Sequence, residues 1–139
     1  GEGALRSQLE QKISAYELQD KIKLPGSVSP VSRLMKELDG FVMPSYTEGF
    51  PITLLEACIL QLPIVASRVG SIEEVLHGYT SSIVVTPGDA SELRDAISKL
   101  IIDDNGEEVN VGSWNALTFD SKNMSEKYSI FYNQLIGDY

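Results

Sequence analysis

At 139 residues the chain is long enough for one domain with a sizeable core. Hydrophobic residues make up 42% of it and charged residues 22%, which excludes a disordered chain and is typical of a soluble globular protein. The net charge of −9 argues against nucleic acid and anionic membranes as partners. It does not exclude one anionic small ligand held at a helix N-terminus.

Cysteine and histidine each occur once, as Cys58 and His77. A single cysteine cannot form an internal disulfide, so we expect a reducing, cytoplasmic setting. One cysteine and one histidine also argue against a zinc site, and we expect no metal. No apolar run approaches the roughly 20 residues that span a bilayer, so we expect no transmembrane segment in this chain.

The first part of the chain alternates between helical and strand-like segments. Leu5, Leu9 and Ile13 recur at a spacing of four, which predicts a helix. Ser29 followed by Pro30 is typical of a helix start. In chain order we predict a helix over residues 2–17, a short strand over 21–26, a helix over 29–38, a strand over 41–44 and a loop over 45–51.

The second part continues this alternation. We predict a helix over 52–61, a strand over 63–67, a helix over 71–78, a strand over 82–86, a helix over 90–102, and tail helices over 105–117 and 121–136. Short strands that are apolar throughout and alternate with helices indicate a parallel sheet covered on both faces. We see no internal repeat or linker, so residues 1–139 form a single α/β domain in this prediction.

The opening residues "GEGALR" are typical of the turn that follows a strand, yet no strand precedes them. A parallel sheet normally begins with a strand. We therefore expect the chain to begin inside a larger protein.

The loop over 45–51 and the helix after it form the candidate site. In an open α/β sheet, ligands bind at the carboxyl ends of the strands, beside helix N-termini. Gly49 leaves room for a ligand to meet the backbone. The amides of Ile52, Thr53 and Leu54 should point out of the new helix, and Thr53 adds a hydroxyl, which together favour a phosphate.

Two acids, Glu48 and Glu56, lie close to this predicted phosphate site. Carboxylates accept hydrogen bonds and do not donate them, so they would repel a phosphate. A carboxylate aimed at a sugar can instead accept two charge-assisted hydrogen bonds from one pair of neighbouring hydroxyls. A nucleotide-diphosphate sugar, with phosphates in the middle and sugars on both sides, would satisfy all these groups.

The stretch "PSYTEGFPITLLEACILQLPIVASRVGSIEEVL" resembles the signature of the retaining family-four glycosyltransferases, two glutamates separated by seven residues. Three further stretches are similar to the same family: "GEGALRSQLE", "PGSVSP…LMKELDGFVMPS" and "SSIVVTPGDASELRDAISKLI". The resemblance covers about residues 1–102 and implies a GT-B fold, in which two Rossmann-like halves enclose the active site. This chain would be most of the C-terminal, donor-binding half, truncated at its N-terminus.

The resemblance also implies a role for each site residue. Glu56 would hold the ribose hydroxyls of the donor, and Glu48 would act as the catalytic residue near the anomeric carbon of the transferred sugar. The backbone of Gly49, Phe50, Pro51, Ile52, Thr53 and Leu54 would hold sugar hydroxyls and diphosphate, and Lys21, Ile22, Lys23 and Leu24 would lie beside the base. No metal or other cofactor is implied.

Several positions depart from the family pattern. Pro51 stands where many members have glycine and removes one amide from the sugar site. Gln61 replaces a small residue, and Ser71 replaces the second glycine of a pair, although Glu74 matches the acid of the same motif. The Arg and Lys that bind the diphosphate in the family have no counterpart in this sequence, and Arg68 is the nearest basic candidate.

The implied enzyme is a hexosyltransferase, which transfers a hexose-type sugar with retention from a nucleotide-diphosphate donor to an acceptor glycan or lipid-linked sugar. The missing N-terminal domain would bind that acceptor. The "EGFP" variant resembles enzymes of bacterial surface-polysaccharide synthesis, which favours a UDP-sugar. We expect a cytoplasmic location and, for the full-length enzyme, one at the inner membrane surface. We expect the fragment to be inactive alone. A nucleotide-sugar epimerase of the same fold and a non-catalytic binding or scaffold module are the alternatives.

Overall fold

The computed structural model describes residues 2–101 and residue 122. The chain divides into two compact units, Gly1–Glu37 and Leu38–Tyr139, and each is described by itself. The tail helices predicted over 105–117 and 121–136 lie outside the described residues, apart from Lys122. Within the described part of the chain, no helix combines the length and apolar character needed to cross a membrane.

The first unit contains two helices, α1 (Arg6–Ala15) and α2 (Val31–Met35). The α1 helix has no buried residue, and its predicted apolar positions Leu5 and Leu9 are exposed. The side chain of Arg6 joins α1 to the segment that follows, because its Nη2 donates a hydrogen bond to the carbonyl of Leu24 at 2.9 Å.

The strand predicted over 21–26 is wrong. The amides of Lys21 and Ile22 both donate to the carbonyl of Leu18, at 3.0 and 2.8 Å, so the segment begins as a turn. The rest of it is irregular, and no described strand pairs with it. An apolar segment becomes a strand only where another strand takes up its backbone hydrogen bonds.

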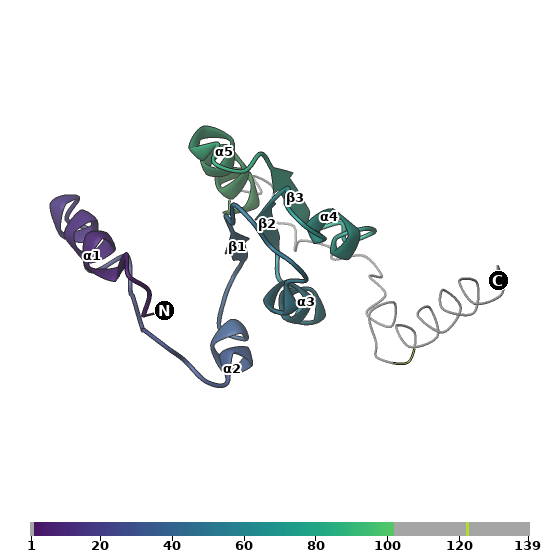
Figure 1. Ribbon diagram of the computed structural model, residues 1–139, viewed down its shortest axis with the longest axis horizontal. Coiled ribbons are helices and arrows are strands. Elements are labelled where there is room, and N and C mark those ends of the chain that lie inside the picture. The colour runs from purple at the N-terminus through teal and green to yellow at the C-terminus, as the bar shows by residue number, and fades with distance from the viewer. Residues whose placement is uncertain (1, 102–121, 123–139) are drawn as a thin grey trace, which may run out of the picture. The chain divides into compact units, whose positions relative to one another are not determined.

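The second unit is built on a parallel sheet of β1 (Phe41–Met43), β2 (Ile64–Ser67) and β3 (Ser82–Val85), in the order β1-β2-β3 (Figure 1). Ile64 of the central strand is in register with Phe41 on one side and with Ser82 on the other. All four residues of β2 are buried. Its first three residues, Ile64, Val65 and Ala66, form the apolar run expected of a central strand that is covered on both faces, and the last, Ser67, is polar.

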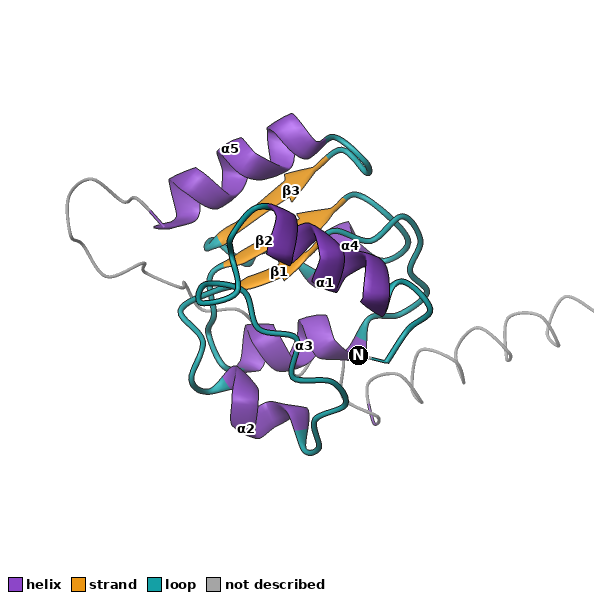
Figure 2. Cartoon of the chain, turned by 90° about the vertical axis from the view of Figure 1, so that its left-hand side faces the viewer, coloured by secondary structure: helices purple, strands orange, loops and turns teal. Residues whose placement is uncertain are grey.

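Helices α3 (Ile52–Ile59), α4 (Ile72–Val75) and α5 (Ala90–Ile101) cover this sheet. Val65 and Val85 form a core with Ala96 of α5 on one face. Neighbouring strand residues point to opposite faces, so Ile64 points away from the face that carries Val65. In Figure 2, α5 and α3 lie on opposite sides of the three strands. The structure therefore confirms the predicted α/β fold, a parallel sheet with helices on both faces.

Candidate functional site

The candidate site is the loop over 45–51, which follows β1 and leads into α3 (Figure 1). The turns after β2 and β3 begin at Arg68 and Thr86. Because the three strands are parallel, their carboxyl ends share one edge of the sheet, the edge at which ligands bind in open α/β sheets.

The side chain of Glu48 is held within this loop. The hydroxyl of Ser45 donates a hydrogen bond to Glu48 Oε1 at 2.6 Å, and the glutamate is partly buried. A short bond to an ionised acceptor is the stronger kind of hydrogen bond. One carboxylate oxygen is thus bound by the protein.

The turn after β2 packs against the backbone of the same loop. Gly70 has a φ of +53°, and a Cβ at this position would collide with the carbonyl of Glu48. The next residue, Ser71, donates its hydroxyl to the carbonyl of Gly49 at 2.8 Å. Gly70 therefore leaves room for the Glu48 carbonyl, and Ser71 holds the next residue of the loop by a hydrogen bond.

Gly49 itself faces open space. Among the described residues, its two chain neighbours aside, no heavy atom lies within 4 Å of the position that a Cβ would take there. The approach of a ligand to the backbone at Gly49 stays a prediction.

The N-terminus of α3 presents two amides. Pro51 is the N-cap residue, with φ −81° and ψ 95°, and its side chain makes no cap hydrogen bond. Within the described part of the chain, the amides of Ile52 and Thr53 have no backbone acceptor, so they are available to an anion. The expectation of a free Leu54 amide is wrong, because that amide donates to the carbonyl of Pro51 at 3.1 Å.

Glu56 lies one turn further along α3 and is partly buried. The opposite face of the helix is the core face, formed by Leu54, Ala57 and Cys58. Burial raises the pKa of the Cys58 thiol from 9.0 to about 12, so at neutral pH the thiol is a protonated core group. This confirms the core position predicted for Cys58.

The aromatic residues of the loop are exposed to solvent. Tyr46 is 79% exposed and Phe50 is 43% exposed. Ile52, the first residue of α3, is 67% exposed. The loop and the start of α3 therefore present three large apolar side chains to solvent.

Basic residues near the candidate site are few. Arg68 follows β2 directly and forms an ion pair with Glu73, with Nε and Oε1 3.6 Å apart. Both side chains are largely exposed, so the pair leaves the guanidinium open to solvent and contributes little to stability. Lys21, Ile22, Lys23 and Leu24 belong to the first unit, and their role beside a base stays a prediction.

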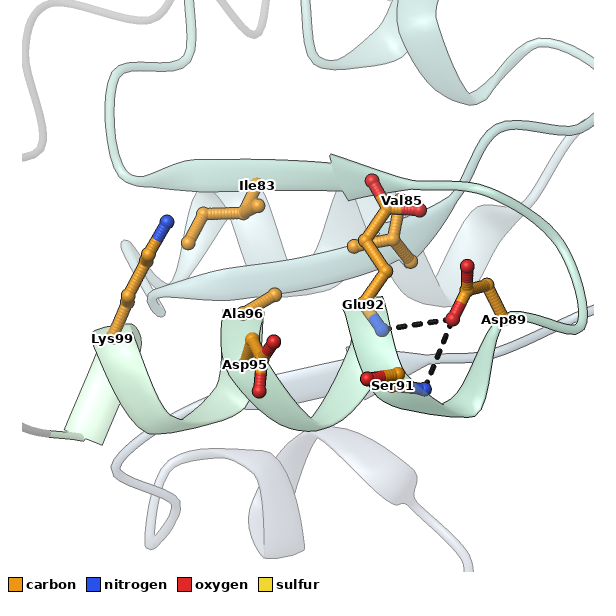
Figure 3. Close-up of a pocket in the computed structure, with 8 residues that line it drawn as sticks. All are labelled: Ile83, Val85, Asp89, Ser91, Glu92, Asp95, Ala96 and Lys99. Atoms are coloured by element: carbon orange, nitrogen blue, oxygen red, sulfur yellow. Dashed lines mark hydrogen bonds between the residues drawn. The ribbon is translucent and has the colours of Figure 1, made fainter.

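A cavity of about 400 Å³ between β3 and α5 was not predicted from the sequence (Figure 3). Three carboxylates, Asp89, Glu92 and Asp95, line it. Asp89 accepts the amides of Ser91 and Glu92 at 3.0 and 2.9 Å and so caps α5, and Glu92 accepts the amide of Thr86 at 2.7 Å. Asp89 therefore stabilises the start of α5, and Glu92 joins α5 to the residue that follows β3.

Comparison with known proteins assigns the chain to a family of enzymes. The family model described as glycosyl transferases group 1 matches residues 1–103. The chain therefore belongs to this glycosyltransferase family, which confirms the resemblance seen in the sequence.

Two curated relatives are each 33% identical to this chain. They are the 2-deoxystreptamine N-acetyl-D-glucosaminyltransferase of Niallia circulans, matched over 75% of this chain and 27% of its own length, and the amylovoran biosynthesis glycosyltransferase AmsK of Erwinia amylovora, matched over 72% and 26%. The chain thus spans about a quarter of the length of these relatives.

Two solved structures share the fold. Sucrose-phosphate synthase from Thermosynechococcus elongatus superposes with a TM-score of 0.72 at 22% identity, over 100% of this chain and 36% of that protein. Anabaena Alr3699/HepE, solved in complex with UDP, gives a TM-score of 0.65 at 28% identity, over 72% of this chain and 28% of that one.

Proposed function

We propose that this chain is the donor-binding part of a retaining glycosyltransferase that uses a nucleotide-diphosphate sugar, with a UDP-sugar favoured. The observation that carries the proposal is the loop over 45–51, which holds the Glu48 carboxylate by a hydrogen bond from Ser45 and leads directly into the open amides of Ile52 and Thr53. Family membership and a similar protein that binds UDP support it.

In this proposal the amides of Ile52 and Thr53 bind a phosphate at the positive end of the α3 dipole. Glu56 accepts hydrogen bonds from the two ribose hydroxyls. Glu48 stabilises the positive charge that develops at the anomeric carbon as the sugar leaves the diphosphate. No metal takes part, and the diphosphate charge is balanced by amides and by basic side chains such as Arg68.

The acceptor, a glycan or a lipid-linked sugar, would bind to another part of the full-length enzyme, in the cytoplasm or at the inner membrane surface. The relatives named above carry transferase names, and one belongs to amylovoran biosynthesis. This favours transfer, within bacterial polysaccharide synthesis, over the epimerase and scaffold alternatives.

An NMR titration of this chain with UDP, GDP and ADP tests the nucleotide assignment. We expect UDP to shift the amides of Ile52 and Thr53, because they point toward the proposed phosphate site, and the other two nucleotides to shift them less. The amides of α5 serve as the internal control, since that helix covers the Val65–Val85 face of the sheet. A folded sample in which no nucleotide shifts the α3 amides would contradict the proposal.

A further inference from the structure

Ser71 contacts the loop that carries Glu48, although 22 positions separate it from its partner, Gly49. Its hydroxyl donates to the Gly49 carbonyl at 2.8 Å. Ser71 is also the N-cap residue of α4, a position where a serine side chain commonly accepts an amide of its own helix. No such cap hydrogen bond forms here, so the hydroxyl serves the loop and not the helix.

Gly70 permits this contact. The Glu48 carbonyl lies so close to Gly70 that any Cβ there would collide with it, and the positive φ of Gly70 also disfavours other residues. The loop therefore reaches the Ser71 hydroxyl only because the preceding residue has no side chain.

Holding the Gly49 carbonyl fixes more than one atom. A peptide group is planar and trans, so its carbonyl and its N–H point in opposite directions. The bond from Ser71 therefore sets the direction of the whole Gly49–Phe50 peptide. The residue before this peptide, Glu48, has its side chain held by a hydrogen bond from the Ser45 hydroxyl at 2.6 Å.

We propose that Ser71 is a positioning residue for the sugar end of the donor. By holding the Gly49–Phe50 peptide, Ser71 keeps the Glu48 carboxylate and the loop backbone in the conformation that contacts the donor sugar. This inference rests on the proposed function, in which the loop contacts the sugar while Glu56 and the α3 amides contact the nucleotide. Loss of the Ser71 hydroxyl should then weaken recognition of the sugar and leave recognition of the nucleotide unchanged.

The test compares the affinity of this chain for UDP with its affinities for UDP-glucose, UDP-galactose and UDP-N-acetylglucosamine, measured by NMR titration. The variants are Ser71→Ala, Ser71→Thr, which keeps the hydroxyl, and Ser82→Ala as a matched control. Ser82 also donates its hydroxyl to a backbone carbonyl, that of Tyr79 at 2.9 Å, but on β3. The carbonyl ¹³C shift of Gly49 reports the hydrogen bond directly.

For the sugar nucleotide that the wild type binds more tightly than UDP, we expect Ser71→Ala to reduce this preference by about 2- to 10-fold, the loss of one hydrogen bond. The affinity for UDP should not change, and Ser71→Thr should restore both the preference and the Gly49 shift. A merely structural role would lower both affinities together. The control Ser82→Ala should keep the preference for the UDP-sugar over UDP. If Ser71→Ala also keeps it, the inference about Ser71 fails and the proposed function stands. If the wild type binds neither UDP nor any of the three UDP-sugars, the proposed function fails and the inference fails with it.

Discussion

Gly49 and Gly70 belong to the same site, but the structure requires glycine at only one of them. Gly70 combines a positive φ with direct contact to the Glu48 carbonyl. Gly49 has open space where a side chain would begin, and its φ lies outside the left-handed region. Gly70 therefore serves the fold of the loop, whereas the fold does not require glycine at position 49, where the proposed function places a ligand.

Substitution by alanine separates these two roles. We expect Gly70→Ala to lower the free energy of unfolding by about 1–3 kcal/mol, because both backbone strain and a collision are introduced. Gly49→Ala should change it by less than about 1 kcal/mol. Urea unfolding of both variants measures this, and equal losses for the two glycines would contradict the account.

The α3 helix belongs both to the candidate site, through its N-terminus, and to the core, through its buried face. Its N-terminus presents amides to solvent, while Leu54, Ala57 and Cys58 on its other face are buried. The buried face anchors the amides, so a change in the core should affect the site mainly through stability.

Leu54 is fully buried, whereas Ile59 on the same helix is 62% exposed. We expect Leu54→Ala to cost about 2–5 kcal/mol of unfolding free energy, because it leaves a cavity. Ile59→Ala should cost less than about 0.5 kcal/mol. Denaturant unfolding followed by circular dichroism gives both values, and a small loss for Leu54→Ala would show that α3 is not docked on the sheet as described.

The end of α3 offers a stabilising change. Gln61 has a φ of +58°, and the amides of Gln61 and Leu62 donate to the carbonyls of Cys58 and Ala57 at 3.0 and 3.1 Å. This is the helix ending in which glycine is the preferred residue. Gln61→Gly should therefore raise the melting temperature, by the equivalent of about 1 kcal/mol, and Gln61→Ala should not.

At the scale of the whole molecule, the sequence predicts what depends on local pattern. The alternation of apolar strands with helices predicts the three parallel strands, and the step from loop to helix predicts Ile52 and Thr53 as exposed donors. The strand over 21–26 is predicted wrongly, because a strand also requires a partner that no local pattern supplies. The contact of Ser71 with Gly49 could not be predicted, since 22 positions separate the two residues.

The stability of the whole fold should fall at alkaline pH. Burial raises the pKa of the Cys58 thiol from 9.0 to about 12, and burial and Cys58 together raise that of the Tyr79 hydroxyl. Between about pH 9 and pH 12 the unfolded chain releases the Cys58 proton and the folded chain retains it, so the unfolding free energy decreases as pH rises.

Urea unfolding between pH 7 and pH 10.5 should therefore show a decline that starts near pH 9. Cys58→Ala should make this decline shallower, because one of the two groups is removed. A decline that is unchanged in Cys58→Ala would show that the thiol ionises with equal ease in both states.

The claim at the centre of this account is that the acids of the site recognise sugar hydroxyls. Its most direct measurement is the affinity of wild type and Glu56→Ala for UDP and for 2′,3′-dideoxy-UDP, which lacks the ribose hydroxyls. We predict that the wild type prefers UDP by about 10-fold or more and that Glu56→Ala has no preference, because the charge-assisted hydrogen bonds need both partners. A Glu56→Ala variant that still prefers UDP as strongly as the wild type would contradict the assignment.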